Sequence, residues 1–487
     1  MQNKFAHVKN LLSDGIVYGL VNAFNKGLSF LIFPFVTRVL TTEEVGIIGI
    51  VASVASLFAI AAMFSMDSAT VRFYFDYKDE LTRKSVIASA FWLQLIFYIF
   101  ALPAIVFTCL VFLSFKQHAA VIMVYLASIV LLNIIYAFGF GVARIRRKPV
   151  GVLLVSLSNS IVLMVMMFVL VIANKQGMMG YFGATLIAFA VSAVVSLLTL
   201  RERIRVRFFS RELSKKMLNY VRPIVPGTIA VWFVENSGIL FTGFIGTMAS
   251  AGIYKVGYTL SQIVVLAIFA FQQAWGPYAL SVHKDAEAKD FFALIFKIFL
   301  LFTVVLGTFL SLFAKEMLAV LFPSQYAGAI DIVALLIFGH IASGLYYIAV
   351  MGLVIAKNMK PYGVISLTMA AATLFGNIAL TNILGAQGPA WVYFIVKAVT
   401  VLAIFFFSQR EYRIPYNFKL GGFVFVSGAL LSFFGNRVLD LFPAGPGAIG
   451  KLVAFAVFVA MLSVLNKSAI AKMIRYVAAA RKKRSRP

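Results

Sequence analysis

The chain has 487 residues, of which 62% are hydrophobic and only 12% are charged, and its mean hydropathy is +0.97. A soluble protein carries about 25% charged residues, so this composition excludes a water-soluble fold. It also excludes a solvated disordered chain, which requires low hydrophobicity. The single cysteine, Cys109, excludes an internal disulfide and a cysteine-based metal cluster.

Fourteen apolar runs are each long enough to cross about 30 Å of hydrocarbon as a helix. Porin-like strands would instead alternate apolar and polar residues over about 10 positions. The sequence therefore predicts an all-α integral membrane protein with 14 transmembrane helices. In chain order the predicted spans cover residues 15–38, 44–66, 85–112, 119–142, 150–173, 179–200, 219–246, 253–274, 291–313, 329–356, 363–382, 388–407, 419–439 and 448–466.

The formal net charge of +26 is distributed unevenly between the connections. Every second connection and both termini together hold 33 of the 43 Lys and Arg residues, and the intervening connections hold six. By the positive-inside rule both termini are predicted to be cytoplasmic, as an even number of spans requires. The positive charge is thus interpreted as a topology signal, and no nucleic-acid partner is expected. The basic tail, residues 467–487, is expected to meet anionic membrane lipids.

An internal repeat divides the predicted helices into two sets. Lys148-Pro149-Val150-Gly151-Val152 recurs as Lys360-Pro361-Tyr362-Gly363-Val364, and Gly46 at the start of helix 2 matches Gly252 at the start of helix 8. Each copy has six spans, so both run the same way through the bilayer and predict a pseudo-two-fold axis along the membrane normal. The expected organisation is a cytoplasmic segment (1–14), an N-lobe (15–208), a C-lobe (209–418), helices 13 and 14 (419–466) and the basic tail.

Polar side chains inside the predicted spans indicate a water-lined cavity, because a charge at mid-bilayer costs several kcal/mol. In helix 1 a spacing of i, i+3, i+4, i+7 puts four polar residues on one face. Other candidates lie on helices 7, 8 and 12. The candidate cavity residues are Asn22, Asn25, Lys26, Ser29, Glu235, Asn236, Lys255, Tyr258, Gln262 and Lys397.

Three of these residues, Lys26, Lys255 and Lys397, are positive, against one carboxylate at Glu235. A net-cationic cavity favours an anionic headgroup such as a phosphate or diphosphate, for which Lys is an ordinary ligand. An internal Lys–Glu pair, or snorkelling near helix ends, would explain the same residues. Lys297, two turns inside helix 9, is interpreted as a snorkelling residue.

Four residues are candidates for gating. Asp67 and Arg72 end helix 2, but their i, i+5 spacing is poor for a pair on one straight helix, so they are expected to organise the 2–3 turn or a gate. Pro226 and Gly227, with Pro223, should bend or loosen the start of helix 7. The bend could be mobile or static.

No catalytic arrangement stands out, and the chain is not expected to be an enzyme. It lacks a Walker A sequence, and its four His residues are far apart without metal-ligand spacing. Neither a cofactor nor a metal is expected. A transporter without a nucleotide site would need coupling to H⁺, Na⁺ or the membrane potential, and Glu235 is the best single carboxylate for such a role.

The segment from Gly19 to Phe75 resembles the N-terminal signature of bacterial polysaccharide flippases, in the Wzx-type branch of the multidrug/oligosaccharidyl-lipid/polysaccharide exporter superfamily. The resemblance rests on Asn25-Lys26-Gly27-Leu28-Ser29-Phe30, on Thr37-Arg38-Val39-Leu40-Thr41-Thr42-Glu43-Glu44-Val45-Gly46, and on Met66-Asp67-Ser68-Ala69 with Arg72-Phe73-Tyr74. It implies two six-helix lobes around a central cavity, with two further helices. In the related lipid II flippases basic residues of helices 1, 2 and 8 matter; Lys26 and Lys255 lie on comparable helices, whereas helix 2 here has no basic residue.

The function expected from this resemblance is translocation of undecaprenyl-diphosphate-linked oligosaccharide from the inner to the outer leaflet of the bacterial cytoplasmic membrane by alternating access. The product would serve O-antigen (lipopolysaccharide), capsule or exopolysaccharide synthesis. Expected partners are the lipid-linked glycan, membrane lipids, and the polysaccharide polymerase with its chain-length machinery. The alternatives are a multidrug/cation antiporter or a lipid II flippase on the same fold, and, of another class, a membrane glycan polymerase or ligase.

Overall fold

The structure is a computed structural model that describes residues 27–28, 30–112, 119–146, 148–439, 444–467, 469 and 471–472. Every regular element in these ranges is helical. Thirteen helical segments within them are long and apolar enough to cross a membrane. The predicted all-α membrane fold is confirmed. The count of 14 is not, because most of the first predicted span, residues 15–38, lies outside the described part of the chain.

The helices form two compact units, which are described separately. Unit 1 comprises Met1–Lys255 with Thr373–Asn382, and unit 2 comprises Val256–Ala372 with Ile383–Pro487. This division differs from the predicted lobes, 15–208 and 209–418, because residues 209–255 contact unit 1. The pseudo-two-fold repeat of the lobes stays a prediction.

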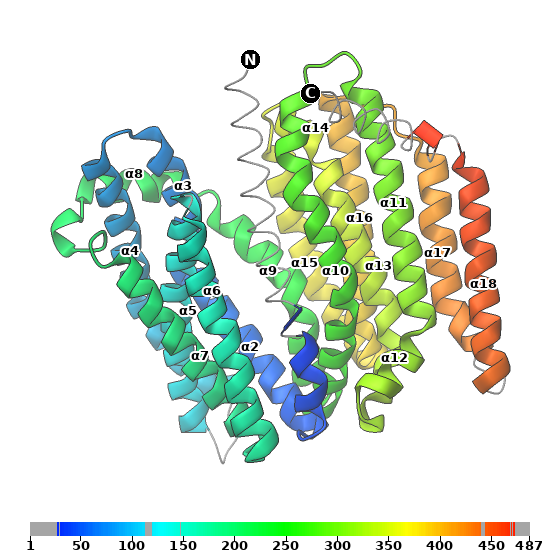
Figure 1. Cartoon of the computed structure of the whole chain (residues 1–487), viewed down its shortest axis with the longest axis horizontal. Helices are drawn as coiled ribbons and strands as arrows, with labels where there is room; N and C mark the ends of the chain where they lie inside the picture. The colour runs from blue at the N-terminus through cyan, green and yellow to red at the C-terminus, as the bar shows by residue number, and fades with distance from the viewer. Residues whose placement is uncertain are drawn as a thin grey trace, which may run out of the picture. The chain divides into compact units, whose positions relative to one another are not determined.

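Unit 1 contains the long helices of the first half of the chain (Figure 1). Its elements are α2 (Thr42–Met63), α3 (Met66–Asp76), α4 (Glu80–Phe112), α5 (Ala119–Ile145), α6 (Pro149–Met166), the π-helix η1 (Met167–Ala173), α7 (Gly177–Leu200), the 3₁₀ turn η2 (Val206–Phe208), α8 (Arg211–Val221), α9 (Val225–Phe241), the π-helix η3 (Thr242–Gly246) and the first turns of α10 (Met248–Val282).

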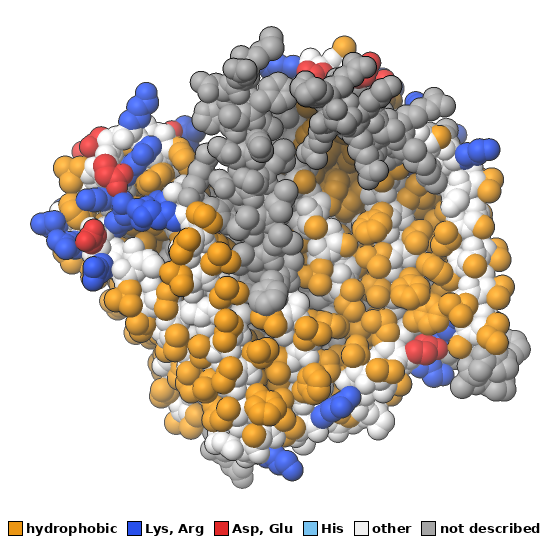
Figure 2. All heavy atoms as spheres, viewed as in Figure 1, with side chains coloured by type: hydrophobic (Ala, Val, Ile, Leu, Met, Phe, Trp, Pro, Cys, Tyr) orange, Lys and Arg blue, Asp and Glu red, His pale blue; other side chains and the backbone are white. Residues whose placement is uncertain are grey.

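Unit 2 begins within α10 and contains the remaining helices. These are α11 (Ala288–Leu312), α12 (Ala314–Leu321), the 3₁₀ segment η4 (Ser324–Ala329), α13 (Ile330–Ala349), α14 (Met351–Ile355), α15 (Lys360–Leu384, of which 373–382 belong to unit 1), α16 (Gln387–Glu411), α17 (Phe418–Leu439) and α18 (Ala444–Leu465). The outward faces of both units carry large apolar side chains, such as Phe100 (76% exposed) and Val464 (74% exposed), as expected for surfaces that face lipid (Figure 2).

The start of α2 is fixed by a carboxylate that also holds α7. Thr41 and Glu44 form a capping box, in which the Glu44 N–H donates to the Thr41 hydroxyl (3.2 Å) and the Thr41 N–H donates to Glu44 Oε2 (2.9 Å). The Met178 N–H, in the first turn of α7, donates to Glu44 Oε1 (3.0 Å). One side chain therefore satisfies backbone donors of two helices.

The predicted second span is interrupted, which the sequence did not indicate. Phe64 and Ser65 both have left-handed backbone conformations (φ 48° and 54°), so α2 ends at Met63 and a separate helix, α3, follows. Such a break normally involves Gly or Pro, and neither is present here. The Ser65 hydroxyl lies 3.3 Å from the hydroxyl of Thr228 on α9, so the break is supported by tertiary contact.

The predicted seventh span, 219–246, is also wrong in its extent. α8 ends at Val221 and α9 begins at Val225, with Pro226 in its first turn, where a missing N–H costs nothing. The prolines therefore separate two helices instead of bending one. α8 is amphipathic: it buries Leu213, Met217 and Val221 in the apolar cluster that α3 and α4 form.

Lys451 is a buried charge inside α18, within the predicted span 448–466. It lies in the second turn of α18, and its side chain is 1% exposed. Its ammonium donates to Glu316 Oε1 of α12 (2.8 Å), within the segment 314–328 that was predicted to be a plain connection. This ion pair ties the last helix to unit 2.

The repeat-related glycines Gly46 and Gly252 contact each other across a close crossing of α2 and α10 within unit 1. A Cβ on Gly46 would collide with the backbone carbonyl of Met248, and one on Gly252 with that of Thr42. Small residues let membrane helices approach at the backbone, where van der Waals contact replaces the missing hydrophobic driving force. Both glycines are therefore required by packing.

We expect Gly46→Ala and Gly252→Ala each to destabilise the protein by about 1–3 kcal/mol, because the added methyl group must push two backbones apart. The measurement is the melting temperature in detergent. Gly422→Ala on α17 is the matched control, since a Cβ there meets no atom within 4 Å. Equal melting temperatures for all three variants would contradict the close crossing.

We expect Glu316→Ala to destabilise the protein by about 2–3 kcal/mol, because it removes the carboxylate from a buried ammonium. This is less than the ~3–5 kcal/mol of a fully buried pair, since the Glu316 side chain is 41% exposed. Adding Lys451→Met to this variant should restore most of the loss in the same thermal assay. Glu212→Ala, which breaks an exposed i, i+4 pair with Lys216, should leave the melting temperature unchanged. A double variant as unstable as Glu316→Ala alone would contradict this interpretation.

Candidate functional site

Four of the predicted cavity residues, Asn22, Asn25, Lys26 and Ser29, lie outside the described residues. Their role stays a prediction. The other six are divided between the two units: Glu235, Asn236 and Lys255 belong to unit 1, whereas Tyr258, Gln262 and Lys397 belong to unit 2.

In unit 1, α9 presents a row of polar side chains to α2. The Trp232 indole N–H donates to the Ser56 hydroxyl (2.8 Å), and Thr228, one turn earlier, contacts Ser65 (3.3 Å). Residues four apart lie on the same helical face, which explains why one bond reaches α2 and the other reaches the break between α2 and α3. This face is used for helix packing.

Glu235 and Asn236 are half-buried near the middle of α9. The Asn236 amide donates to the Trp232 carbonyl of its own helix (3.0 Å), so this side chain caps a backbone group. On the next position, the Ser237 hydroxyl accepts a hydrogen bond from the Asn377 amide of α15 (3.0 Å). Asn377 is 1% exposed, and its amide oxygen has no hydrogen-bond partner within the described part of the chain. It marks a polar position that the predicted site did not include.

Lys255 is half-buried in the second turn of α10. Its aliphatic chain passes the α2 backbone at Gly49, where a Cβ would lie 3.6 Å from Lys255 Cδ and would collide with Ile239 of α9. Gly49 therefore leaves room for the Ile239 side chain, and the Lys255 stem lies beside it. Lys255 thus lies close to α2 and to α9, the helix that carries Glu235.

In unit 2, Lys397 is the centre of a buried aromatic cluster. Lys397 is 9% exposed, and its ammonium lies 5.4 Å from the ring centroid of Tyr393, one turn earlier on α16. The Tyr393 hydroxyl lies 2.9 Å from Nδ1 of His340 on α13 and shares a hydrogen bond with it. The His340 ring in turn contacts Tyr258 of α10 edge-to-face at 5.5 Å. Two predicted residues, Lys397 and Tyr258, are therefore joined through two that were missed.

Of the two missed residues, Tyr393 had a weak signal in the sequence and His340 had none. Tyr393 precedes Lys397 by four positions, the spacing that puts two side chains on one helical face. His340 had no such signal, because its partners come from other helices. Gly339 beside it leaves room for the Tyr393 ring, which a Cβ would contact. Gln262, the remaining candidate, is half-buried one turn after Tyr258.

This cluster, Tyr258–His340–Tyr393–Lys397, holds a positive charge where hydrocarbon would surround the helix. Aromatic faces stabilise a lysine ammonium by about 0.5–2 kcal/mol. An ammonium held in this way can attract an anionic group, and a hydrogen-bonded Tyr–His pair can pass a proton. The cluster therefore has the chemistry of an anion-binding or proton-transfer site. Among the described residues no group of three or more His, Cys, Asp or Glu side chains could hold a metal.

The candidate gating residues lie in two places. Arg72 pairs with Asp76 (3.3 Å) one turn later on α3, and not with Asp67, as the unfavourable i, i+5 spacing indicated. Pro226 starts α9, and a Cβ on Gly227 would meet no atom within 4 Å. Whether these residues gate stays a prediction.

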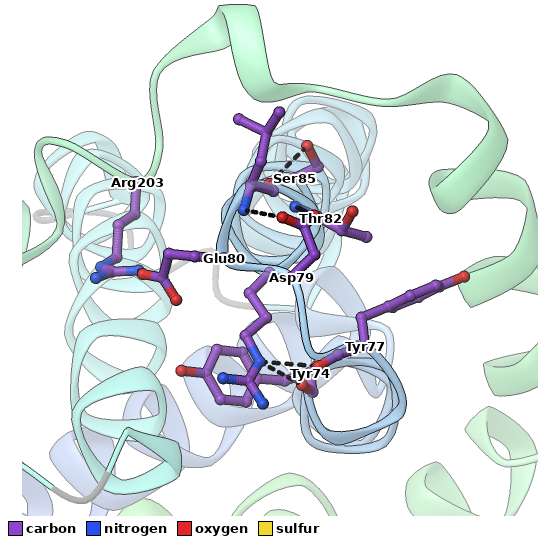
Figure 3. Close-up of polar contacts among 9 residues, drawn as sticks. Tyr74, Tyr77, Asp79, Glu80, Thr82, Ser85 and Arg203 are labelled. Carbon is purple, nitrogen blue, oxygen red and sulfur yellow. Dashed lines mark hydrogen bonds and ion pairs between the residues drawn. The ribbon is translucent and has the colours of Figure 1, made fainter.

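The turn from α3 to α4 is fixed by backbone hydrogen bonds (Figure 3). Asp79 accepts from the Leu81 and Thr82 N–H groups (3.2 and 2.6 Å) at the start of α4. The Thr82 hydrogen bonds lower the pKa of Asp79, so the carboxylate is ionised at neutral pH and its contribution to stability is lost only as the pH falls through that lowered pKa. Arg83 Nε donates to the carbonyls of Tyr74 (3.2 Å) and Tyr77 (2.9 Å).

The basic segment after α7 is folded against this turn. Arg203 forms an ion pair with Glu80 (2.6 Å) (Figure 3). The Trp92 indole donates to the Ile204 carbonyl (2.9 Å). Ser89 and Ser210 bond α4 to the start of α8 (3.0 Å). Lys and Arg side chains gather over α8 and the neighbouring helix ends of unit 1 (Figure 2). The segment from Arg201 to Arg222, which carries eight Lys and Arg residues, is thus a folded part of unit 1.

Comparison with known families now identifies the chain. A family model described as polysaccharide biosynthesis protein matches residues 11–283. The chain belongs to this family. The predicted resemblance to polysaccharide flippases agrees with this match. No curated protein matches the chain in sequence.

Solved structures of membrane transporters share the fold of this member of the polysaccharide biosynthesis family. One is an inward-facing multidrug resistance transporter of the MATE family in the MOP superfamily (TM-score 0.63, 18% identity, covering 81% of this chain and 97% of that chain). Another is the lipid II flippase MurJ in an inward closed conformation (TM-score 0.63, 14% identity, 93% and 100% covered). The chain is therefore a multi-pass membrane protein with a MATE- and MurJ-like fold.

We expect Tyr393→Phe to destabilise this polysaccharide biosynthesis protein by about 1–2 kcal/mol, because it leaves a buried ring nitrogen of His340 without the tyrosine hydroxyl. Thermal unfolding in detergent measures the loss. Tyr220→Phe is the control, since Tyr220 is 39% exposed and retains its ring contact with Phe73. A Tyr393→Phe variant as stable as the control would show that the hydrogen bond contributes nothing.

Proposed function

We propose that the protein is a flippase that moves undecaprenyl-diphosphate-linked oligosaccharide from the inner to the outer leaflet of the bacterial cytoplasmic membrane. The family match and the transporter fold support a role in lipid-linked glycan transport. The observation that carries the proposal is Lys397, a lysine that is 9% exposed in the middle of a predicted span. In a protein of polysaccharide biosynthesis, a buried ammonium is suited to a diphosphate.

The proposed cycle is alternating access. The diphosphate and sugars enter from the cytoplasm and contact Lys397, Lys26 and Lys255, while the polyisoprenoid tail stays in the bilayer. Both termini are cytoplasmic in this proposal, since the lysine-rich connections remain inside. The exported unit then serves O-antigen, capsule or exopolysaccharide synthesis, together with the polymerase and its chain-length machinery.

Energy for net transport has to come from an ion or from the membrane potential, since the sequence carries no Walker A motif. Within this proposal Glu235 in unit 1 and the Tyr393–His340 pair in unit 2 are the groups suited to exchange a proton. A carboxylate and an imidazole titrate nearer to neutral pH than a lysine does. A substrate bound at Lys397 would then change the electrostatic environment of Tyr393 directly, because the two side chains are in contact.

The test is a leaflet-accessibility assay of lipid-linked oligosaccharide in a deletion strain that carries the gene on a plasmid. We expect Lys397→Ala to lower outward transfer at least tenfold, because a charged hydrogen bond contributes about 1.5–3 kcal/mol. Lys397→Arg should retain part of the activity. Lys360→Ala, an exposed lysine at the start of α15, is the matched control. Protein levels in the membrane are compared for every variant.

The outcomes separate the rival functions. Unchanged transfer in both Lys397→Ala and Lys26→Ala would contradict a lysine-lined diphosphate site. A deletion strain with normal surface glycan and altered drug resistance would instead indicate a multidrug/cation antiporter. Loss of viability on deletion would indicate a lipid II flippase. Elongation or transfer of lipid-linked glycan by the purified protein in detergent would indicate a polymerase or ligase.

A further inference from the structure

Two hollows in unit 2 form one groove with a polar end and an apolar end. The first, about 310 Å³, lies where α11 begins and where the chain continues beyond α18. The second, about 510 Å³, lies further along the same two helices. Leu301 of α11 lines both hollows. Leu462, which lines the second, and Asn466, which lines the first, are four residues apart at the end of α18. The two hollows therefore adjoin along α11 and the α18 end.

The polar end carries positive charge. Lys297, half-buried two turns inside α11, and Lys472, exposed beyond α18, both line it, and Asp290 in the first turn of α11 is the one described carboxylate in the lining. Asn417 and Asn466 add amide groups. Asn466 is 0% exposed, and its amide oxygen has no hydrogen-bond partner among the described residues. This oxygen is an acceptor, so it needs a donor such as a headgroup hydroxyl, whereas the two lysines need an anion.

The apolar end has the opposite character. Its lining is formed by side chains of α11 and α18, among them Val305, Phe309, Phe455 and Val459, with Ser463 as a small polar exception. These residues belong to helical segments long and apolar enough to cross the bilayer, so the groove faces hydrocarbon at this depth. A chain of methylene groups fits such a lining without cost.

We propose that this groove binds an anionic phospholipid of the membrane, with its phosphate between Lys297 and Lys472 and an acyl chain between α11 and α18. Basic pockets between membrane helices at the cytoplasmic side are known to suit anionic lipid headgroups. Charge complementarity selects this occupant. A zwitterionic lipid would place its own ammonium near the two lysines, which is unfavourable. The C-terminal segment Arg481-Lys482-Lys483-Arg484 is also basic, so it is not a complementary occupant either.

The site differs from the proposed substrate site in its chemistry. Lys397 is buried against an aromatic ring, whereas Lys297 and Lys472 lie at an open hollow at the ends of helices. The inference does not depend on the identity of the transported substrate. A resident lipid here would stabilise the contact of α18 with α11, whereas the Lys451–Glu316 pair holds the other end of α18 to α12.

The experiment is native mass spectrometry of the full-length protein in detergent, titrated with dioleoyl phosphatidylglycerol or dioleoyl phosphatidylethanolamine. We expect tighter binding of phosphatidylglycerol. Lys297→Ala and Lys472→Ala should each weaken it roughly fivefold, and the double variant more than tenfold, since each lysine near a headgroup contributes about 1 kcal/mol. The matched control is Lys284→Ala/Lys360→Ala, which removes two exposed lysines that do not line the groove.

A second variant tests the apolar end independently of charge. Val459→Trp fills the groove between α11 and α18 and should weaken phosphatidylglycerol binding while both lysines remain. Melting temperatures measured without added lipid verify that each variant is folded. Equal binding of the two lipids, or a lysine double variant that binds as well as its control, would overturn the proposal.

Competition separates the phospholipid from the transported lipid. Undecaprenyl phosphate that displaces phosphatidylglycerol at lower concentration would overturn the proposal and assign the groove to the substrate tail. Because the readout is binding and not transport, failure of this inference leaves the proposed flippase function untouched. Failure of the leaflet assay would likewise leave the lipid-binding result unchanged.

Discussion

The fold depends on the cost of an unpaired polar group in hydrocarbon, which is several kcal/mol for each backbone or side-chain group left without a partner. The described helices meet this cost in two ways. Hydroxyl groups donate back to carbonyls of their own helix, as Thr242 does to Gly238 (2.7 Å) and Thr303 to Phe299 (2.8 Å). Others bond across helices, as Trp232 does to Ser56. Polar residues within the spans therefore also hold helices together, and a polar residue in a span is not by itself evidence of a cavity.

Close packing of helix backbones is the second consequence of the surrounding hydrocarbon. Lipid tails are as apolar as leucine, so membrane helices gain little from hiding leucine and gain more from close backbone contact. Gly46 and Gly252 illustrate this, and so does Gly352, where a Cβ would collide with the Ser408 hydroxyl of α16. These glycines stand where repeat-related or neighbouring helices cross. Their positions in the sequence repeat thus have a physical explanation in unit 1, even though the symmetry of the lobes is still a prediction.

The sequence predicted the class and most helices because hydropathy over 20 residues is a local property. It failed where tertiary contacts decide: the left-handed break at Phe64 and Ser65, the separation of α8 from α9, and the burial of Lys451 opposite Glu316. The candidate site shows the same limit. Lys397 was identifiable as a charge within an apolar run, but Tyr393 is one of 19 tyrosines, and His340 gains meaning only through a partner on another helix.

Unit 2 contains two kinds of lysine, which differ in how far water screens their charge. Lys397 is 9% exposed and lies against the ring of Tyr393, which is hydrogen-bonded to His340, so water screens its charge little and a bound anion would interact with it strongly. Lys297 and Lys472 lie at an open hollow, where each contributes modestly and where the apolar groove has to supply the remaining affinity. A buried charge suits a ligand that must be bound and released in a cycle with a proton or ion. Movement of a proton at Tyr393 or His340 would change the electric field at the Lys397 ammonium and so its affinity for an anion. An open, amphipathic site suits a lipid that stays, because its affinity is spread over many weak contacts that no single step of transport disrupts.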